Sequence, residues 1–143
     1  MSRVLLPIDP TQPARTRSAV EQVVRLRAGG AVTVRLLRVQ PQVSGHVAML
    51  FGAGELHELL QRTGAEDLQF AQQLLELAGV PYTSTVRVGR SAETIVTAAH
   101  DFGCDRIVFG ADEPGLAGKI FGSLAQQVRQ LLGASESPKV LGS

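Results

Sequence analysis

Residues 86–110 read VRVGRSAETIVTAAHDFGCDRIVFG, and this stretch holds one complete strand–helix–strand pattern. Its central part carries apolar residues at a spacing near 3.6, which predicts an amphipathic helix with Ser91 as its N-cap and Gly103 just beyond its end. The last five residues, RIVFG at 106–110, form a continuous apolar run, as strands covered on both faces do. The pattern therefore indicates a parallel sheet.

The same alternation extends over the rest of the chain. Further strands are predicted at residues 4–8, 32–39, 80–88 and 138–141. Apolar stripes predict helices around residues 19–26, 55–78 and 124–132, and Gly64 is expected to break or shift the second of these. Residues 40–54 are rich in glycine and lack a regular spacing, so they are predicted to form a long connection. The element order predicts a single α/β domain over residues 1–143, with helices on both faces of the sheet.

The composition argues against several classes of function. The net charge is +1, with 14 basic and 13 acidic residues, which gives no electrostatic footprint for nucleic acid or an anionic membrane. No apolar run approaches the roughly 18 residues that a membrane span needs, and no signal peptide is recognised, so a cytoplasmic location is expected. The basic residues Arg15, Arg17, Arg25 and Arg27 are interspersed and are interpreted as a solvated helix face.

Candidate binding residues follow the strands. In open α/β sheets ligands bind beyond the carboxyl ends of the strands, where Asp9, Val39 and Gly110 fall. Gly122 and Ser123 open the last helix, whose backbone N–H groups could hold a phosphate. Two plainer interpretations remain open: Asp9 as an Asx-turn or N-cap residue, and the Gly122–Ser123 pair as an ordinary helix cap.

Enzymatic motifs are incomplete. Gly118–Lys119 resembles the end of a phosphate-binding P-loop, but Glu113 and Ile120 stand where glycine and Ser or Thr are required. His57 begins a zinc-protease pattern in which Gln61 replaces the second ligand. The lone Cys104 is interpreted as a small buried hydrophobe rather than a nucleophile. No catalytic role is therefore expected, although slow ATP hydrolysis stays open as a less favoured alternative.

Taken together, four segments resemble the universal stress protein family. They are VLLPID at residues 4–9, LLRV at 36–39, the stretch 86–110 and FGSLAQQV at 121–128. The resemblance implies a doubly wound sheet of five parallel strands in the order 3-2-1-4-5, of the adenine-nucleotide-alpha-hydrolase-like type, in a homodimer. It also implies a stress-response sensor or regulatory module, some members of which bind ATP.

The nucleotide-binding members of that family resemble the pattern Gly-x2-Gly-x9-Gly-[Ser/Thr]. Gly110 matches its first position and Gly122–Ser123 its last pair, but the loop is one residue short, and Asp112 or Glu113 occupies the second glycine position. An acidic side chain there would repel phosphate by about 1 kcal/mol or more.

The resemblance also implies roles on the adenosine side of the ligand. Ile8 and Val39 would flank the base and Asp9 would meet the adenosine, and Leu124 completes the expected binding set. The leading hypothesis is a homodimer that binds ATP or another adenine nucleotide weakly. The alternative is a homodimeric interaction protein that binds no nucleotide.

Overall fold

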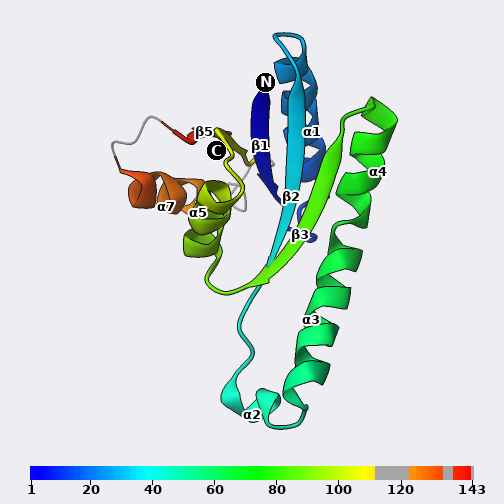
Figure 1. The fold of residues 1–143 in the computed structure, drawn as a ribbon, viewed down its shortest axis with the longest axis vertical. Coiled ribbons are helices and arrows are strands. Elements are labelled where there is room, and N and C mark those ends of the chain that lie inside the picture. The colour runs from blue at the N-terminus through cyan, green and yellow to red at the C-terminus, as the bar shows by residue number, and fades with distance from the viewer. Residues whose placement is uncertain (112–122, 134–136, 143) are drawn as a thin grey trace.

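The computed structural model describes residues 1–111, 123–133 and 137–142. Five parallel strands form one sheet in the order β3-β2-β1-β4-β5, which confirms the predicted doubly wound fold class (Figure 1). The strands are β1 (Ser2–Pro7), β2 (Val32–Gln40), β3 (Tyr82–Val88), β4 (Arg106–Val108) and β5 (Lys139–Leu141).

Helices cover the sheet on both sides. Helices α1 and α4 pack on one face, and α5 and α7 pack on the other (Figure 1). Strand β1 lies in the middle, and its alternation sends Val4 and Leu6 to the first face and Leu5 to the second, all fully buried. The described helices are α1 (Pro13–Arg27), α2 (Gly45–Ala48), α3 (Ala53–Asp67), α4 (Gln69–Ala78), α5 (Ser91–Asp101) and α7 (Ser123–Leu132).

The helix ends differ in detail from the prediction. Ser91 is the first residue of α5, whose N-cap is Arg90 without a side-chain hydrogen bond. Gly103 follows the helix with a φ of +63°, as predicted for a residue just beyond a helix end. The predicted break at Gly64 is wrong, because α3 continues to Asp67 and is separated from α4 at Leu68.

Gly64 is explained by packing instead. A Cβ atom at this position would lie 2.5 Å from Cγ1 of Val86 in β3, which is closer than carbon atoms can approach. The absence of a side chain therefore lets α3 lie close against the edge strand of the sheet.

The segment predicted as an irregular connection is partly ordered. Residues 45–48 form α2, whose N-cap residue Ser44 accepts a hydrogen bond of 3.4 Å from the backbone N–H of Val47. Helix α2 and the first half of α3 extend beyond the carboxyl edge of the sheet (Figure 1). Within the described part of the chain, no helix is long and apolar enough to cross a membrane.

Candidate functional site

A small cavity opens at the carboxyl edge of the sheet. Its volume is about 80 Å³. It lies between the ends of β1 and β2, the residue after β4, and the start of α5 and α7. The described residues that line it are Pro7, Ile8, Asp9, Arg15, Leu37, Arg38, Val39, Ser91, Ile95, Phe109 and Leu124.

Strand order places this cavity at the switch point of the sheet. From β1 the chain builds β2 and β3 on one side, and it then crosses to β4 and β5 on the other. The loops after β1 and β4 consequently diverge and leave a crevice between them. Four of the residues expected at a binding site, Ile8, Asp9, Val39 and Leu124, are brought together there.

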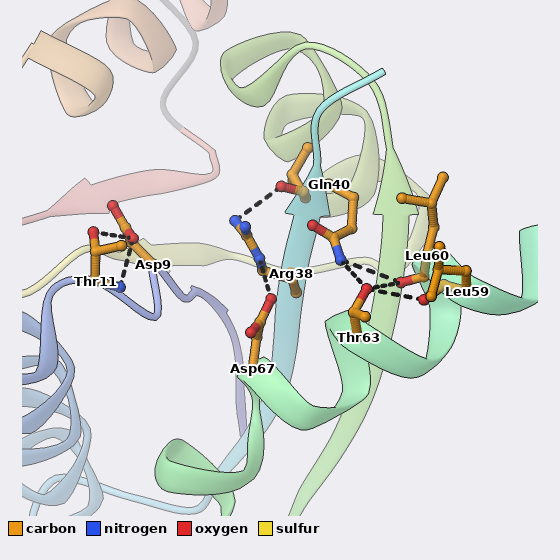
Figure 2. Close-up of polar contacts among 9 residues, drawn as sticks. Asp9, Thr11, Arg38, Gln40, Leu59, Leu60, Thr63 and Asp67 are labelled. Atoms are coloured by element: carbon orange, nitrogen blue, oxygen red, sulfur yellow. Dashed lines mark hydrogen bonds and ion pairs between the residues drawn. The ribbon is translucent and has the colours of Figure 1, made fainter. Parts of the chain in front are cut away.

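Asp9 has a local structural role at the cavity. Its Oδ1 atom accepts hydrogen bonds from the backbone N–H and the hydroxyl of Thr11, at 2.9 Å and 2.7 Å (Figure 2). This is the Asx-turn that the sequence left open as the plainer interpretation. The turn fixes one carboxylate oxygen and leaves the residue in the lining of the cavity.

Arg15 is a cavity residue that the sequence interpretation missed. Its exposed fraction is only 6%, so its assignment to a solvated helix face is wrong. Burial lowers the pKa of the Arg15 guanidinium, and the nearby Asp9 carboxylate acts in the opposite direction. The overlooked signal is spacing, because Arg15 lies four residues before Ala19 and thus on the buried stripe of α1.

Two other basic residues of α1 contact the helix beside it. The Arg17 guanidinium lies 5.3 Å from the centroid of the Phe70 ring. Nη1 of Arg27 donates to the carbonyl oxygens of Ala78 and Gly79 at 3.3 Å and 2.9 Å. These contacts link α1 to α4, and Arg17, Arg25 and Arg27 are exposed, which agrees with the predicted solvated helix face.

Arg38 also lines the cavity, and its guanidinium is held by two neighbouring groups. Its Nε donates to Oδ2 of Asp67 at 3.0 Å, and its Nη1 donates to the carbonyl oxygen of Val39 at 3.0 Å (Figure 2). Asp67 is the last residue of α3, so the ion pair ties that helix to β2 beside the cavity. The sequence offered no signal for this pair, because its members lie 29 positions apart.

A polar network fixes the neighbouring end of β2. The buried Gln40 donates through Nε2 to the carbonyl oxygen of Leu60 at 3.2 Å and to Oγ1 of Thr63 at 2.9 Å (Figure 2). The Thr63 hydroxyl donates in turn to the carbonyl oxygen of Leu59 at 2.9 Å. Because these groups satisfy one another, Val39, the residue before Gln40, is held in a defined position at the cavity.

Gly110 has a packing role of its own. Its φ is +78°, and a Cβ atom would lie 2.4 Å from the carbonyl oxygen of Arg15 and 2.9 Å from the backbone N of Ala19. Glycine is therefore required for the close approach of this turn to α1, whatever ligand binds nearby. The next residue, Ala111, donates its N–H to Oγ of Ser18 at 2.9 Å.

Part of the expected phosphate loop cannot be placed. Gly122, Asp112 and Glu113 lie outside the described residues, and so does the side chain of Ser123, the first residue of α7. In the described ranges, no group of three His, Cys, Asp or Glu side chains is arranged to hold a metal ion.

A five-stranded parallel sheet with a cavity at its switch point defines a doubly wound α/β protein of the nucleotide-hydrolase-like type. The sequence profile of the universal stress protein family matches residues 1–132. The chain therefore belongs to the universal stress protein family. A comparison with curated protein sequences found no match.

Solved structures of the family share this fold. The universal stress protein from Archaeoglobus fulgidus is 20% identical, with a TM-score of 0.69 over 99% of this chain and 98% of that one. A universal stress protein in complex with cAMP is 16% identical, with a TM-score of 0.65 over 99% and 96% of the two chains. An Arabidopsis thaliana family member with AMP bound is 15% identical, with a TM-score of 0.62 over 99% and 92%. At these identities the likeness establishes the fold alone.

Proposed function

We propose that this protein is a sensor or regulatory module that binds an adenine nucleotide in the cavity at the carboxyl edge of the sheet. The observation that supports this most directly is the meeting of Ile8, Asp9, Val39 and Leu124 at the switch point. Related proteins of the same fold are described in complex with cAMP and with AMP, which supports a nucleotide as the ligand class.

The proposed roles follow from the chemistry of the lining. Ile8 and Val39 offer apolar surface to the two faces of the base, and Asp9 offers a carboxylate oxygen to a ribose hydroxyl. Arg15 supplies positive charge beside an anionic ligand. Asp112 and Glu113 oppose added phosphates, so we expect ATP to bind no more than about tenfold tighter than AMP, or roughly 1.4 kcal/mol, without metal.

The size of the cavity supports weak binding. Its volume of about 80 Å³ is well below the 300 Å³ or more that is typical of small-molecule sites. A nucleotide can enter only if lining side chains move, and that rearrangement lowers the apparent affinity.

The same small volume favours a second candidate function. In this alternative the protein is a homodimeric stress-response interaction protein that binds no nucleotide, and its cavity is only a packing gap. A catalytic role is the least favoured, because Asp112 and Glu113 are the only acidic residues of the loop that follows Gly110.

A matched pair of variants tests the proposal. Leu124→Trp adds an indole beside the cavity, whereas Leu77→Trp adds the same group to an exposed position on α4. Titration calorimetry with AMP, ADP and ATP should give about tenfold weaker binding for the first variant and no change for the second. If the unmodified protein binds none of the three nucleotides at millimolar concentration, the interaction-protein function replaces the proposal.

A further inference from the structure

A second and larger cavity lies at the opposite, amino edge of the sheet. Its volume is about 310 Å³, and it opens where β1, β2 and β3 begin. Its lining includes Arg3, Thr33, Arg35, Thr83, Phe102 and Cys104. This volume is within the range of small-molecule sites, and the cavity shares no lining residue with the first.

Strand register brings the polar groups of this cavity together. Arg3 pairs with Thr33 across β1 and β2, and Arg35 pairs with Thr83 across β2 and β3. Arg3 and Arg35 each lie two residues before a member of the apolar cluster beneath α5, Leu5 and Leu37, so they share its face of the sheet. On the neighbouring strand β3, Thr83 is exposed, so this face of the sheet is open to solvent there.

Arg35 lies against an aromatic ring. Its guanidinium carbon lies 4.0 Å from the centroid of Phe102, the residue that follows α5. Nη1 of Arg35 donates to the Thr85 hydroxyl at 3.3 Å. These two contacts orient the guanidinium without neutralising it.

The positive charge of Arg3 and Arg35 is not paired within the described part of the chain. The ion pairs found there use Arg38, Arg87 and Arg90, and none involves Arg3 or Arg35. Nearby Asp101 is already bound to Arg87 at 2.9 Å. Two guanidinium groups therefore line the cavity. The neighbouring Asp105 carboxylate accepts a hydrogen bond from the backbone N–H of Arg3 at 2.9 Å.

Apolar surface lies beside the two guanidinium groups. Pro81 and the Phe102 ring provide it. We propose that this cavity binds a small amphipathic organic anion, with its carboxylate or phosphate head at Arg3 and Arg35 and its apolar body against Phe102. Guanidinium groups suit both heads, because their donors match a pair of oxygen atoms.

Cys104 provides a built-in reporter of this site. It is the only cysteine of the chain, it lines the cavity, and its exposed fraction is 7%. Burial raises the pKa of the Cys104 thiol, Arg35 and Arg3 act to lower it, and Asp105 acts to raise it. A bound anion would offset the two guanidinium groups and cover the thiol, so its thiolate would become scarcer and less accessible.

The test measures alkylation of Cys104 by iodoacetamide in the intact protein. Hexanoate and phenyl phosphate should slow the reaction in a saturable manner by about threefold or more at roughly 10 mM. Hexanamide, which has the same apolar body and no charge, should have no effect. AMP should give no protection either, so this result is independent of nucleotide binding at the other edge.

Variants locate the effect. Arg3→Gln and Arg35→Gln should each abolish protection, whereas Arg62→Gln on the exposed side of α3 should retain it. Arg3 makes no side-chain hydrogen bond with the described residues, so its variant keeps the test valid even if Arg35→Gln unfolds. The proposal is wrong if neither anion protects Cys104, if hexanamide protects it equally, or if protection survives in Arg3→Gln.

Discussion

Arg15 is the residue whose environment bears most directly on the proposed function. It is buried in α1, it lines the carboxyl-edge cavity, and it faces Asp9. A buried charged group is stable only where opposite charge or hydrogen bonds offset the loss of water. The phosphate of a ligand would provide further opposite charge. At the residue scale, Arg15 therefore brings positive charge to the cavity, whereas Asp112 and Glu113 bring negative charge to the phosphate loop.

Arg15→Gln should separate phosphate binding from base binding. We expect affinity for AMP to fall about tenfold, while affinity for adenosine changes little, because only AMP carries the group that a guanidinium attracts. Titration calorimetry with both ligands measures the difference. Arg17→Gln, on the same helix but directed at Phe70, is the control. Equal losses for AMP and adenosine would mean that Arg15 acts only on the fold of the cavity.

At the scale of elements, α3 depends on its close approach to β3. Gly64→Ala should destabilise the protein by about 1–2 kcal/mol, since its methyl group would overlap Val86. Gly54→Ala in the same helix meets no atom within 4 Å and should be neutral or stabilising by up to about 1 kcal/mol. Urea unfolding of both variants gives the comparison. Equal stabilities would show that Val86 can rotate away without cost.

The segment around α2 should be the first site of proteolysis. Residues 42–54 extend beyond the sheet, and Met49 and Leu50 are 84% and 81% exposed. Limited digestion with chymotrypsin, followed by mass spectrometry, should place the first cut near residues 49–51. An initial cut within α4 would contradict this, because Ala71 and Leu75 anchor that helix in the core.

At the scale of the whole molecule, the open question is how β5 is covered. This short strand lies at the edge of the sheet, and an exposed edge invites pairing with another chain. We propose a homodimer formed through this edge, as the family resemblance implied. The backbone of Lys139 donates to Asp105, and the Leu141 carbonyl accepts from Phe109, so the backbone groups of Val140 between them point away from β4.

Val140→Pro should therefore separate dimerisation from folding. Proline removes only an outward N–H at this position, which an edge strand tolerates, and it blocks pairing with a second chain. We expect a folded monomer for Val140→Pro, and a dimer for both the unmodified protein and Val140→Ala. Sedimentation measures the mass and circular dichroism checks the fold. A monomeric unmodified protein at high concentration would exclude the dimer, and so would a dimeric proline variant.

The strands, the longer helices and their alternation were predictable from the sequence, whereas the short helix α2 was not. The apolar spacing within 86–110 predicts a helix and a strand from residues only a few positions apart. The strand order, in contrast, came from the resemblance to the family. The positions of Ile8, Asp9 and Val39 at one edge also followed, because parallel strands end on the same side. The sequence could not decide whether Asp9 binds a ligand or forms an Asx-turn. Both roles require an aspartate directly after the first strand.

The sequence alone determined a parallel α/β sheet with helices on both faces, and the edge at which a ligand would be expected. Tertiary structure decided the environment of the charged residues. Arg15 is buried because α1 lies against Gly110, 95 positions away, and Arg3, Arg35 and Phe102 meet because strand register and the end of α5 bring them to one cavity. Helical and strand periodicity show which face a side chain takes, whereas burial and charge pairing depend on what the distant chain places opposite that face.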